Sequence, residues 1–244
     1  MNTVTQKGKF LTAEWRKLII ANYPIDPEIL MPFVPKGTEL DFFEDVCYVS
    51  LVGFMFLNTK LLGIRIPFHQ NFEEFNLRFY VKRKMPDGWR RGVVFIKEIV
   101  PKPAIASIAN WVYHEPYVSM PMKNEIIYSE GNLNVGYYFQ YKNFWNKFTV
   151  KAKDTPISFH SGLVEDFITE HYWGYNKYSE HITMEYEVEH PSWKVYPVLD
   201  FNIHMRFKEL YGEPFASVLQ SRPLSILMAE GSEILVRSGS KLVF

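Results

Sequence analysis

The sequence lacks several features on which common locations and functions depend. Its single cysteine, Cys47, cannot form a disulfide within the chain, and the N-terminal stretch MNTVTQKGKF has no apolar core of a secretion signal. The longest apolar run, residues 46–57, is shorter than the roughly 20 residues that a membrane-spanning helix needs. These absences predict a cytoplasmic protein with no transmembrane helix.

An excess of charge of one sign is also missing. The chain carries 27 Lys and Arg residues against 27 Asp and Glu residues, so its formal net charge is zero. Proteins that bind DNA or RNA usually need a basic surface to neutralise the phosphates. We therefore expect no nucleic-acid partner.

The motifs that usually hold metals and cofactors are missing as well. The chain has no glycine-rich phosphate loop, no nucleophile elbow and no pair of cysteines, and its seven histidines do not follow a metal-ligand spacing. Cys47 lies inside the apolar run of residues 46–57, where a cysteine usually packs as a small hydrophobic residue. We expect neither a metal nor another cofactor, and no cysteine nucleophile.

What the sequence does contain is alternation with a period of two, which is typical of β-strands. Phe75, Leu77, Phe79 and Val81 alternate with Glu74, Asn76, Arg78 and Tyr80, so the two sets fall on opposite faces of one strand. Residues 182–190 and 201–208 alternate in the same way, which predicts half-buried strands. Residues 46–57 are apolar on both faces, which predicts a strand at the centre of a sheet.

Helical signals are few. Asp26 followed by Pro27 predicts one or two turns, residues 161–175 show the apolar stripe of an amphipathic helix, and residues 212–223 predict a third short helix. At 244 residues and 47% hydrophobic, the chain can bury one large core. We therefore predict a single, mainly β domain over residues 1–244, whose antiparallel strands form a closed or nearly closed barrel.

The segment GVVFIKEIVPKP, residues 92–103, places Lys97 beside Glu98 just before a pair of prolines. Alternation puts Glu98 on the face of Val94 and Ile96, which favours the interior, and turns Lys97 the other way. A lysine whose pKa is lowered by burial can form a Schiff base, whereas most strand lysines are ordinary surface charges. Lys102 is open to the same two interpretations, and the candidate catalytic residues are Lys97, Glu98 and Lys102.

Other polar residues are candidates for binding a ligand. Arg78 can grip a carboxylate with two hydrogen bonds if its strand face points into a cavity; the alternative is a solvated outer face on which Glu74 pairs with Arg78. His190 falls on an apolar face, either as an acid or base or as a hydrogen-bonded core residue. The candidate substrate-binding residues are Glu74, Asn76, Arg78, Glu115, Tyr117 and His190.

The order of FEEFNLRFYV, GVVFIKEIVPK, ANWVYHEPYVSMPM, EHYWGY and HPSW resembles the YqjF-like family of uncharacterised bacterial proteins, which is grouped structurally with acetoacetate decarboxylase. The resemblance covers nearly the whole chain. It implies an antiparallel, acetoacetate-decarboxylase-like double β-barrel with a central cavity. In that decarboxylase a lysine beside a second lysine forms a Schiff base with a β-keto acid.

This chain departs from both patterns. Lys102 is followed by Pro103, so the neighbouring cation that would activate a Schiff-base amine is absent. Many YqjF-like proteins carry an Arg-x-x-x-x-Leu-Pro-Tyr pattern where this chain has Asn110 and then Glu115-Pro116-Tyr117. The resemblance therefore does not imply one shared activity.

Two functions remain open from the sequence. The first is a lyase- or decarboxylase-like enzyme that acts on a small carboxylate or keto acid. Lys97 or Lys102 would be the amine, Glu98 or Glu74 the acid and base, and Arg78 would orient the substrate. The second is a non-catalytic pocket for a small molecule, without an activated lysine. A structural or interaction protein would instead have a filled barrel and an exposed apolar patch. The sequence leaves open whether the chain forms a homo-oligomer.

Overall fold

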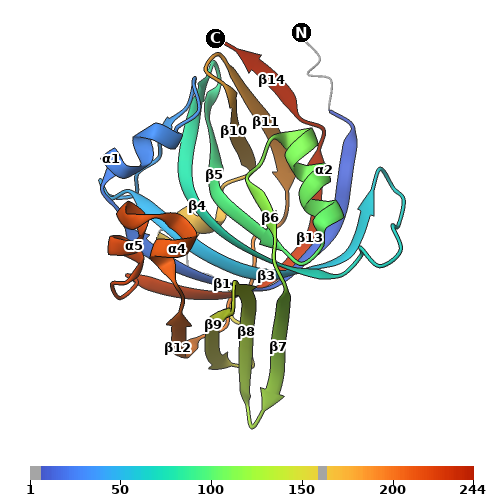
Figure 1. Ribbon diagram of the computed structural model, residues 1–244, viewed down its shortest axis with the longest axis vertical. Coiled ribbons are helices and arrows are strands. Elements are labelled where there is room, and N and C mark those ends of the chain that lie inside the picture. The colour runs from blue at the N-terminus through green and yellow to red at the C-terminus, as the bar shows by residue number, and fades with distance from the viewer. Residues whose placement is uncertain (1–6, 159–163) are drawn as a thin grey trace.

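The computed structural model describes residues 7–158 and 164–244, and its fold is mainly β (Figure 1). A ten-stranded sheet contains β1 (Lys9–Pro24), β2 (Glu39–Leu40), β3 (Tyr48–Leu61), β4 (Phe72–Met85), β5 (Gly88–Val100), β6 (Tyr117–Ser119), β10 (Trp173–Ser179), β11 (Ile182–Glu189), β13 (Ser225–Arg237) and β14 (Ser240–Val243). A four-stranded sheet contains β7 (Met122–Ser129), β8 (Asn132–Tyr141), β9 (Phe144–Lys153) and β12 (Val198–His204).

The helices are short. They are α1 (Pro27–Leu30), α2 (Pro103–Tyr113), α3 (Val164–Thr169), α4 (Phe207–Tyr211) and α5 (Glu213–Leu219), with a 3₁₀ turn, η1 (Met31–Phe33), after α1. The Asp26 side chain accepts a hydrogen bond from the Glu28 amide at 3.0 Å, which confirms the predicted start of α1. In the described ranges, no helix combines the length and the apolar character that crossing a bilayer requires.

The strand pairings of the large sheet return to their starting point. The order runs β4-β3-β1-β13-β11-β10-β5, and β5 also pairs with β4, so these strands form a closed circuit. Most of the pairings are antiparallel, but β5 lies parallel to both β10 and β6. The four-stranded sheet, in the order β12-β9-β8-β7, lies below the circuit in Figure 1.

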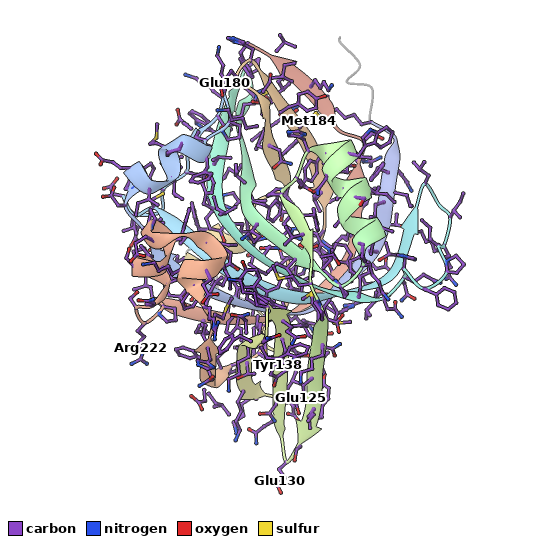
Figure 2. The ribbon with its side chains drawn as sticks, in the orientation of Figure 1. Glu125, Glu130, Tyr138, Glu180, Met184 and Arg222 are labelled. Atoms are coloured by element: carbon purple, nitrogen blue, oxygen red, sulfur yellow. The ribbon has the colours of Figure 1, made fainter. Side chains whose placement is uncertain are left out.

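The β7–β8 hairpin projects away from the circuit. Figure 2 shows Glu130 at its outer tip and Glu125 and Tyr138 further along it, whereas Met184 and Glu180 lie at the opposite end of the molecule. The core between the two sheets includes Phe75 of β4, whose ring centroid lies 5.1 Å from that of Phe139 on β8. A second group of buried apolar side chains lines the inside of the circuit.

Several predictions about the strands can be compared with the structure. β3 pairs with β1 on one side and β4 on the other, and Tyr48 to Phe56 are all buried, which confirms its predicted central position. β4 is not half-buried as expected. It is covered on one face by the four-stranded sheet with α4 and α5, and on the other by the inside of the circuit.

One local expectation was wrong. Only Val164–Thr169 of the predicted helix over 161–175 is helical in the described residues, and residues 161–163 lie outside them. The aromatic segment that follows becomes β10 because it pairs with β11 and β5. After β13 the chain turns at residues 238–239, and β14 then pairs with β11.

Candidate functional site

A cavity of about 220 Å³ lies inside the closed circuit of strands. Each strand of the circuit contributes lining residues, among them Trp15, Phe54, Asn76, Val93, Gly174, Tyr186 and Val236. Ile105 and Ile108 of α2 and Ile66 and His69 of the β3–β4 connection also line it. The walls are largely apolar and aromatic, which is typical of a pocket for a small organic molecule.

Three carboxyl groups lie together in this cavity. Glu74 comes from β4, Glu98 from β5, and Glu115 from the segment between α2 and β6; their exposed fractions are 2%, 1% and 7%. Strand register explains their proximity, because Asn76 is the partner of Glu98 across β4 and β5, and Tyr117 is the partner of Glu98 across β5 and β6.

A β-bulge in β5 brings Glu98 into the cavity. Leu77 pairs with Lys97 but the next residue, Arg78, pairs with Phe95, so Ile96 is an extra residue in the strand. Phe95 and Glu98 therefore both line the cavity, although simple alternation would separate them. The prediction that Glu98 shares a face with Val94 and Ile96 was wrong, because those two side chains pack in the core between the sheets.

The end of α2 positions the third carboxyl group. His114 adopts a left-handed conformation with φ of 58°, which ends the helix and turns the chain. The Asn110 side chain then holds the backbone of Tyr117 at both ends, since its Nδ2 donates to the Tyr117 carbonyl at 3.0 Å and its Oδ1 accepts from the Tyr117 amide at 2.9 Å. This clamp fixes Glu115 and Tyr117 against β5.

Hydroxyl and amide groups bind part of the carboxyl cluster. Glu74 accepts from the Tyr117 hydroxyl at 2.9 Å and from Asn76 Nδ2 at 3.0 Å, and Glu115 accepts from the Tyr186 hydroxyl. Burial raises the pKa of Glu74 to about 7 and that of Glu115 to about 7. Burial and the two neighbouring carboxylates raise the pKa of Glu98 well above its usual value. The cluster therefore holds protons near neutral pH.

Some polar atoms of the cluster have no protein partner. Within the described residues, no group hydrogen-bonds to Glu98 Oε2 or to Asn76 Oδ1, and both atoms are buried. Unpaired buried polar atoms are costly and uncommon. Their presence on the wall of a cavity indicates a place for a polar part of a ligand.

Arg78 lies on the same cavity wall. Its side chain is buried, yet no carboxylate of the described residues lies within ion-pair distance of it. Its Nη2 donates to the Ile168 carbonyl at 3.4 Å, and its Nε is buried without a partner in the described part of the chain. A buried, unpaired guanidinium is a ready site for an anion.

Beside Arg78 is a residue that the sequence did not single out. His171 lines the cavity, and its Nε2 lies 3.2 Å from Asp41 Oδ2. Asp41 also accepts from Arg91 Nε at 2.6 Å. Burial would raise the pKa of Asp41, but the bonds to His171 and Arg91 outweigh burial and keep it below its usual value. The only sequence signal for His171 was its place in the family-like segment EHYWGY.

His190 also lines the cavity. Its ring stacks on Trp193 with centroids 4.5 Å apart, and its Nδ1 donates to the Pro191 carbonyl at 3.1 Å. Burial lowers the pKa of the imidazole. His190 is thus a neutral, aromatic part of the wall near neutral pH.

The two candidate lysines are not in the cavity. Lys97 lies on the opposite face of β5, where its Nζ donates to the Leu210 carbonyl and lies 5.5 Å from the centroid of Tyr211. Burial lowers its pKa. Lys102 precedes the first turn of α2, because β5 ends at Val100 and Pro103 begins the helix. Among the described residues, no lysine lines the cavity.

The structure thus brings together Glu98 and all six candidate substrate-binding residues, and separates them from Lys97 and Lys102. Over residues 7–158 and 164–244, no group of three or more His, Cys, Asp or Glu side chains is arranged to hold a metal ion.

Several solved structures share this fold. Acetoacetate decarboxylase from Legionella pneumophila matches with a TM-score of 0.67 and 11% identity, over 100% of this chain and 92% of that protein. An acetoacetate decarboxylase-like enzyme from Sphingomonas wittichii RW1 matches with a TM-score of 0.63 and 14% identity, over 97% of this chain and 94% of that protein. The enduracididine biosynthesis enzyme MppR, solved with pyruvate, matches with a TM-score of 0.63 and 10% identity, over 98% of this chain and 92% of that protein. At these identities the matches establish the fold alone.

The sequence comparisons define the family more narrowly. The family model DUF2071, described as "Uncharacterized conserved protein", matches residues 12–233, and the chain belongs to this family. The chain is also 28% identical over 184 residues to the uncharacterized protein YqjF of Bacillus subtilis (strain 168), a match that covers 73% of this chain and 72% of that protein. The expected YqjF-like membership and the decarboxylase-like fold are both confirmed.

Proposed function

We propose that the cavity binds a small carboxylate or keto acid and that the Glu74, Glu98 and Glu115 cluster exchanges protons with it. Arg78 receives the carboxylate of the ligand, and the apolar walls hold its carbon skeleton. The observation that carries the proposal is the buried Arg78 guanidinium, which has no carboxylate partner in the described residues but shares a cavity with three buried carboxyl groups.

The protonation of the cluster supports acid–base chemistry. A general acid or base works best when its pKa lies near the working pH, and the pKa of Glu74 is raised to about 7 by burial. In a bound keto acid, Glu74 takes the proton from the carbon next to the carbonyl while protonated Glu98 donates its proton to the carbonyl oxygen. The product is an enol, and the reverse transfer restores the ketone.

The positions of the lysines argue against an imine mechanism. Lys97 Nζ is bonded to the Leu210 carbonyl outside the cavity, and Lys102 does not line it. This observation favours a second candidate, in which the cavity binds the same acids without chemistry. The two candidates share Arg78 and differ in the role of Glu98.

Solvent deuterium exchange separates these candidates. The protein is incubated in deuterium oxide with pyruvate, acetoacetate or phenylpyruvate, and deuterium in the recovered acid is followed by NMR. Binding is measured in parallel by the fluorescence of Trp15 and Trp193, which line the cavity. We expect binding of at least one acid and catalysed exchange at the carbon next to its carbonyl.

The matched variant is Glu98→Gln, which keeps the shape of the side chain and removes its acidic proton. It should bind the acid and lose the exchange. Binding without exchange in the wild-type protein would leave the non-catalytic pocket as the function. Failure of all three acids to bind would overturn the proposal that this is a keto-acid pocket.

The predictions about the double barrel, the domain, the location and the partners remain predictions. We propose that the closed strand circuit is one barrel of the double β-barrel, supported by its pairings, which return from β5 to β4. A single domain over residues 1–244, a cytoplasmic location and the lack of a nucleic-acid partner remain expectations from the sequence, which leaves open whether the chain forms a homo-oligomer.

A further inference from the structure

His171 has a fixed tautomer in this structure. Its Nε2 faces a carboxylate oxygen of Asp41 at 3.2 Å, and a carboxylate can only accept a hydrogen bond. Nε2 therefore carries the proton. Burial lowers the pKa of His171 to about 4, so the ring is neutral near pH 7 and Nδ1 carries a lone pair.

That lone pair has no donor. In the part of the chain that the structure describes, no group hydrogen-bonds to His171 Nδ1, and the His171 side chain is only 1% exposed. A buried acceptor without a donor costs free energy unless something else supplies the donor. Since His171 lines the cavity, a ligand bound there lies beside its ring.

Arg78 and His171 both lie near the same tyrosine, Tyr80. The Arg78 guanidinium lies 5.8 Å from the centroid of the Tyr80 ring, and the Tyr80 ring lies 4.7 Å from that of His171. Arg78 also donates to the carbonyl of Ile168, three residues before His171. An unpaired donor, Arg78 Nε, and an unpaired acceptor, His171 Nδ1, thus occupy neighbouring positions of the same wall.

From this juxtaposition we infer that the preferred ligand is a hydroxy acid, whose carboxylate binds Arg78 and whose adjacent hydroxyl group donates to His171 Nδ1. The inference rests on the proposed function, because it assumes that Arg78 binds the carboxylate. It adds the chemical class of the ligand and a binding residue, His171. Asp41 acts as a positioning residue, since it determines which ring nitrogen of His171 is the acceptor.

A keto acid matches the hydrogen-bonding groups of Arg78 and His171 less well than a hydroxy acid does. Its carbonyl oxygen is an acceptor, so beside Arg78 it leaves the Nδ1 lone pair unpaired, whereas a hydroxyl group satisfies it. The hydroxyl group is what distinguishes the preferred ligand from a plain acid of the same size.

The test is a comparison of acids that differ only in the hydroxyl group. Phenyllactate is compared with hydrocinnamate, and lactate with propionate, so that both a large and a small skeleton are examined by calorimetry and tryptophan fluorescence. We expect the hydroxy acid of at least one pair to bind about tenfold more tightly, the effect of one well-formed hydrogen bond. The methyl ester of phenyllactate should bind more weakly than the acid because it lacks the charge for Arg78.

The variant His171→Phe keeps an aromatic ring against Tyr80 and removes the acceptor. The hydroxyl preference should disappear in this variant, while binding of the plain acid is retained. His204→Phe, the same change at an exposed position on β12, should keep the preference. Asp41→Asn provides a second test, because an amide can donate to Nε2 and shift the ring proton to Nδ1, which would weaken the preference for the hydroxyl group.

A direct readout does not depend on any variant folding. In NMR spectra of ¹⁵N-histidine protein, phenyllactate should shift the signal of His171 Nδ1, and hydrocinnamate should leave it nearly unchanged. Equal affinity for both members of each pair would overturn the hydroxy-acid inference and leave the carboxylate pocket intact. If none of the four acids binds to the wild-type protein while pyruvate, acetoacetate or phenylpyruvate does, the inference alone fails. If no acid of either set binds, the proposed function fails as well.

Discussion

The two faces of β4 differ in the side chains that they carry and in what covers them. One face carries Phe75, Leu77 and Phe79, which are fully buried in the core between the sheets. The other carries Glu74, Asn76 and Arg78, which are buried against the cavity and leave two polar atoms, Asn76 Oδ1 and Arg78 Nε, without a partner in the described residues. The same strand thus supports a filled apolar core on one side and a polar, partly empty site on the other.

This difference indicates that one face of β4 contributes mainly to stability and the other mainly to ligand binding. Each apolar side chain on the packed face gains free energy by leaving water. Each ionisable side chain on the cavity face loses hydration and recovers only part of it from its neighbours. Changes on the first face should therefore affect folding, whereas changes on the second should affect binding.

Phe75→Ala should have the largest effect on folding. It removes a ring that packs on Phe139 of the small sheet, and such truncations usually cost about 3–5 kcal/mol. Chemical denaturation followed by circular dichroism measures the loss. The matched change on the other face is Glu74→Gln, which keeps the side-chain shape and should alter the free energy of unfolding far less. An equal loss in both variants would contradict the separation of the two faces.

Arg78→Met should have the largest effect on binding. It keeps the length of the aliphatic chain and removes the charge, and hydrogen bonds to charged groups contribute about 1.5–3 kcal/mol, so affinity for carboxylates should fall roughly 10- to 100-fold. Titration of tryptophan fluorescence checks this. Lys84→Met removes an exposed cation of the same strand and should leave affinity unchanged. Equal losses in the two variants would point to general charge attraction instead of a specific site.

The sequence predicted the faces of β4 well because alternation is a local property. Glu74, Asn76 and Arg78 must share a face of any regular strand, whichever fold surrounds it. The sequence could not decide whether that face meets solvent or a cavity, since that depends on strands as distant in the chain as β1 and β13. The family resemblance favoured the cavity. The solved structures confirm the fold that the resemblance implied.

Glu98 and His171 illustrate what local patterns miss. The bulge at Ile96 changes the alternation of β5, and no glycine or proline marks it in the sequence. His171 was assigned to a helix that ends at Thr169, and its partner Asp41 lies 130 residues away in the chain. Both positions depend on tertiary pairing and could not follow from the spacing of residues.

The pH dependence of stability tests whether the carboxyl groups on the cavity face are protonated near neutral pH. Burial raises the pKa of Glu74 and of Glu115 from 4.5 to about 7. Between these values the folded protein keeps a proton that the unfolded chain has lost, so each carboxyl group makes stability fall as pH rises, by at most about 1.4 kcal/mol per pH unit. This is opposite to the usual effect of a salt-bridged carboxylate.

The variant carrying both Glu74→Gln and Glu115→Gln tests this effect. It also removes the two carboxylates that raise the pKa of Glu98, which changes the difference in the same direction. Burial lowers the pKa of His171 from 6.5 to about 4, so between these values His171 makes stability rise with pH. The residue is unchanged in the variant, so its contribution cancels in the difference between the two proteins. Denaturation at a series of pH values should show the wild type losing stability relative to the variant from about pH 4.5 to pH 7. A constant difference across this range would mean that the two carboxyl groups titrate normally.

Lys97→Met should have the smallest effect, and it tests the packed face as a place for chemistry. The substitution removes the hydrogen bond to the Leu210 carbonyl but keeps an apolar chain beside Tyr211, so the free energy of unfolding should change by less than about 1 kcal/mol. Because Lys97 lies outside the cavity, binding of carboxylates and deuterium exchange should both be unchanged. Treatment with borohydride in the presence of acetoacetate, followed by mass measurement of the intact chain, should give no adduct in either the wild type or the variant. An adduct present in the wild type and absent in Lys97→Met would show that this lysine reaches a substrate, and the division of β4 and β5 into a structural and a functional face would then have to be abandoned.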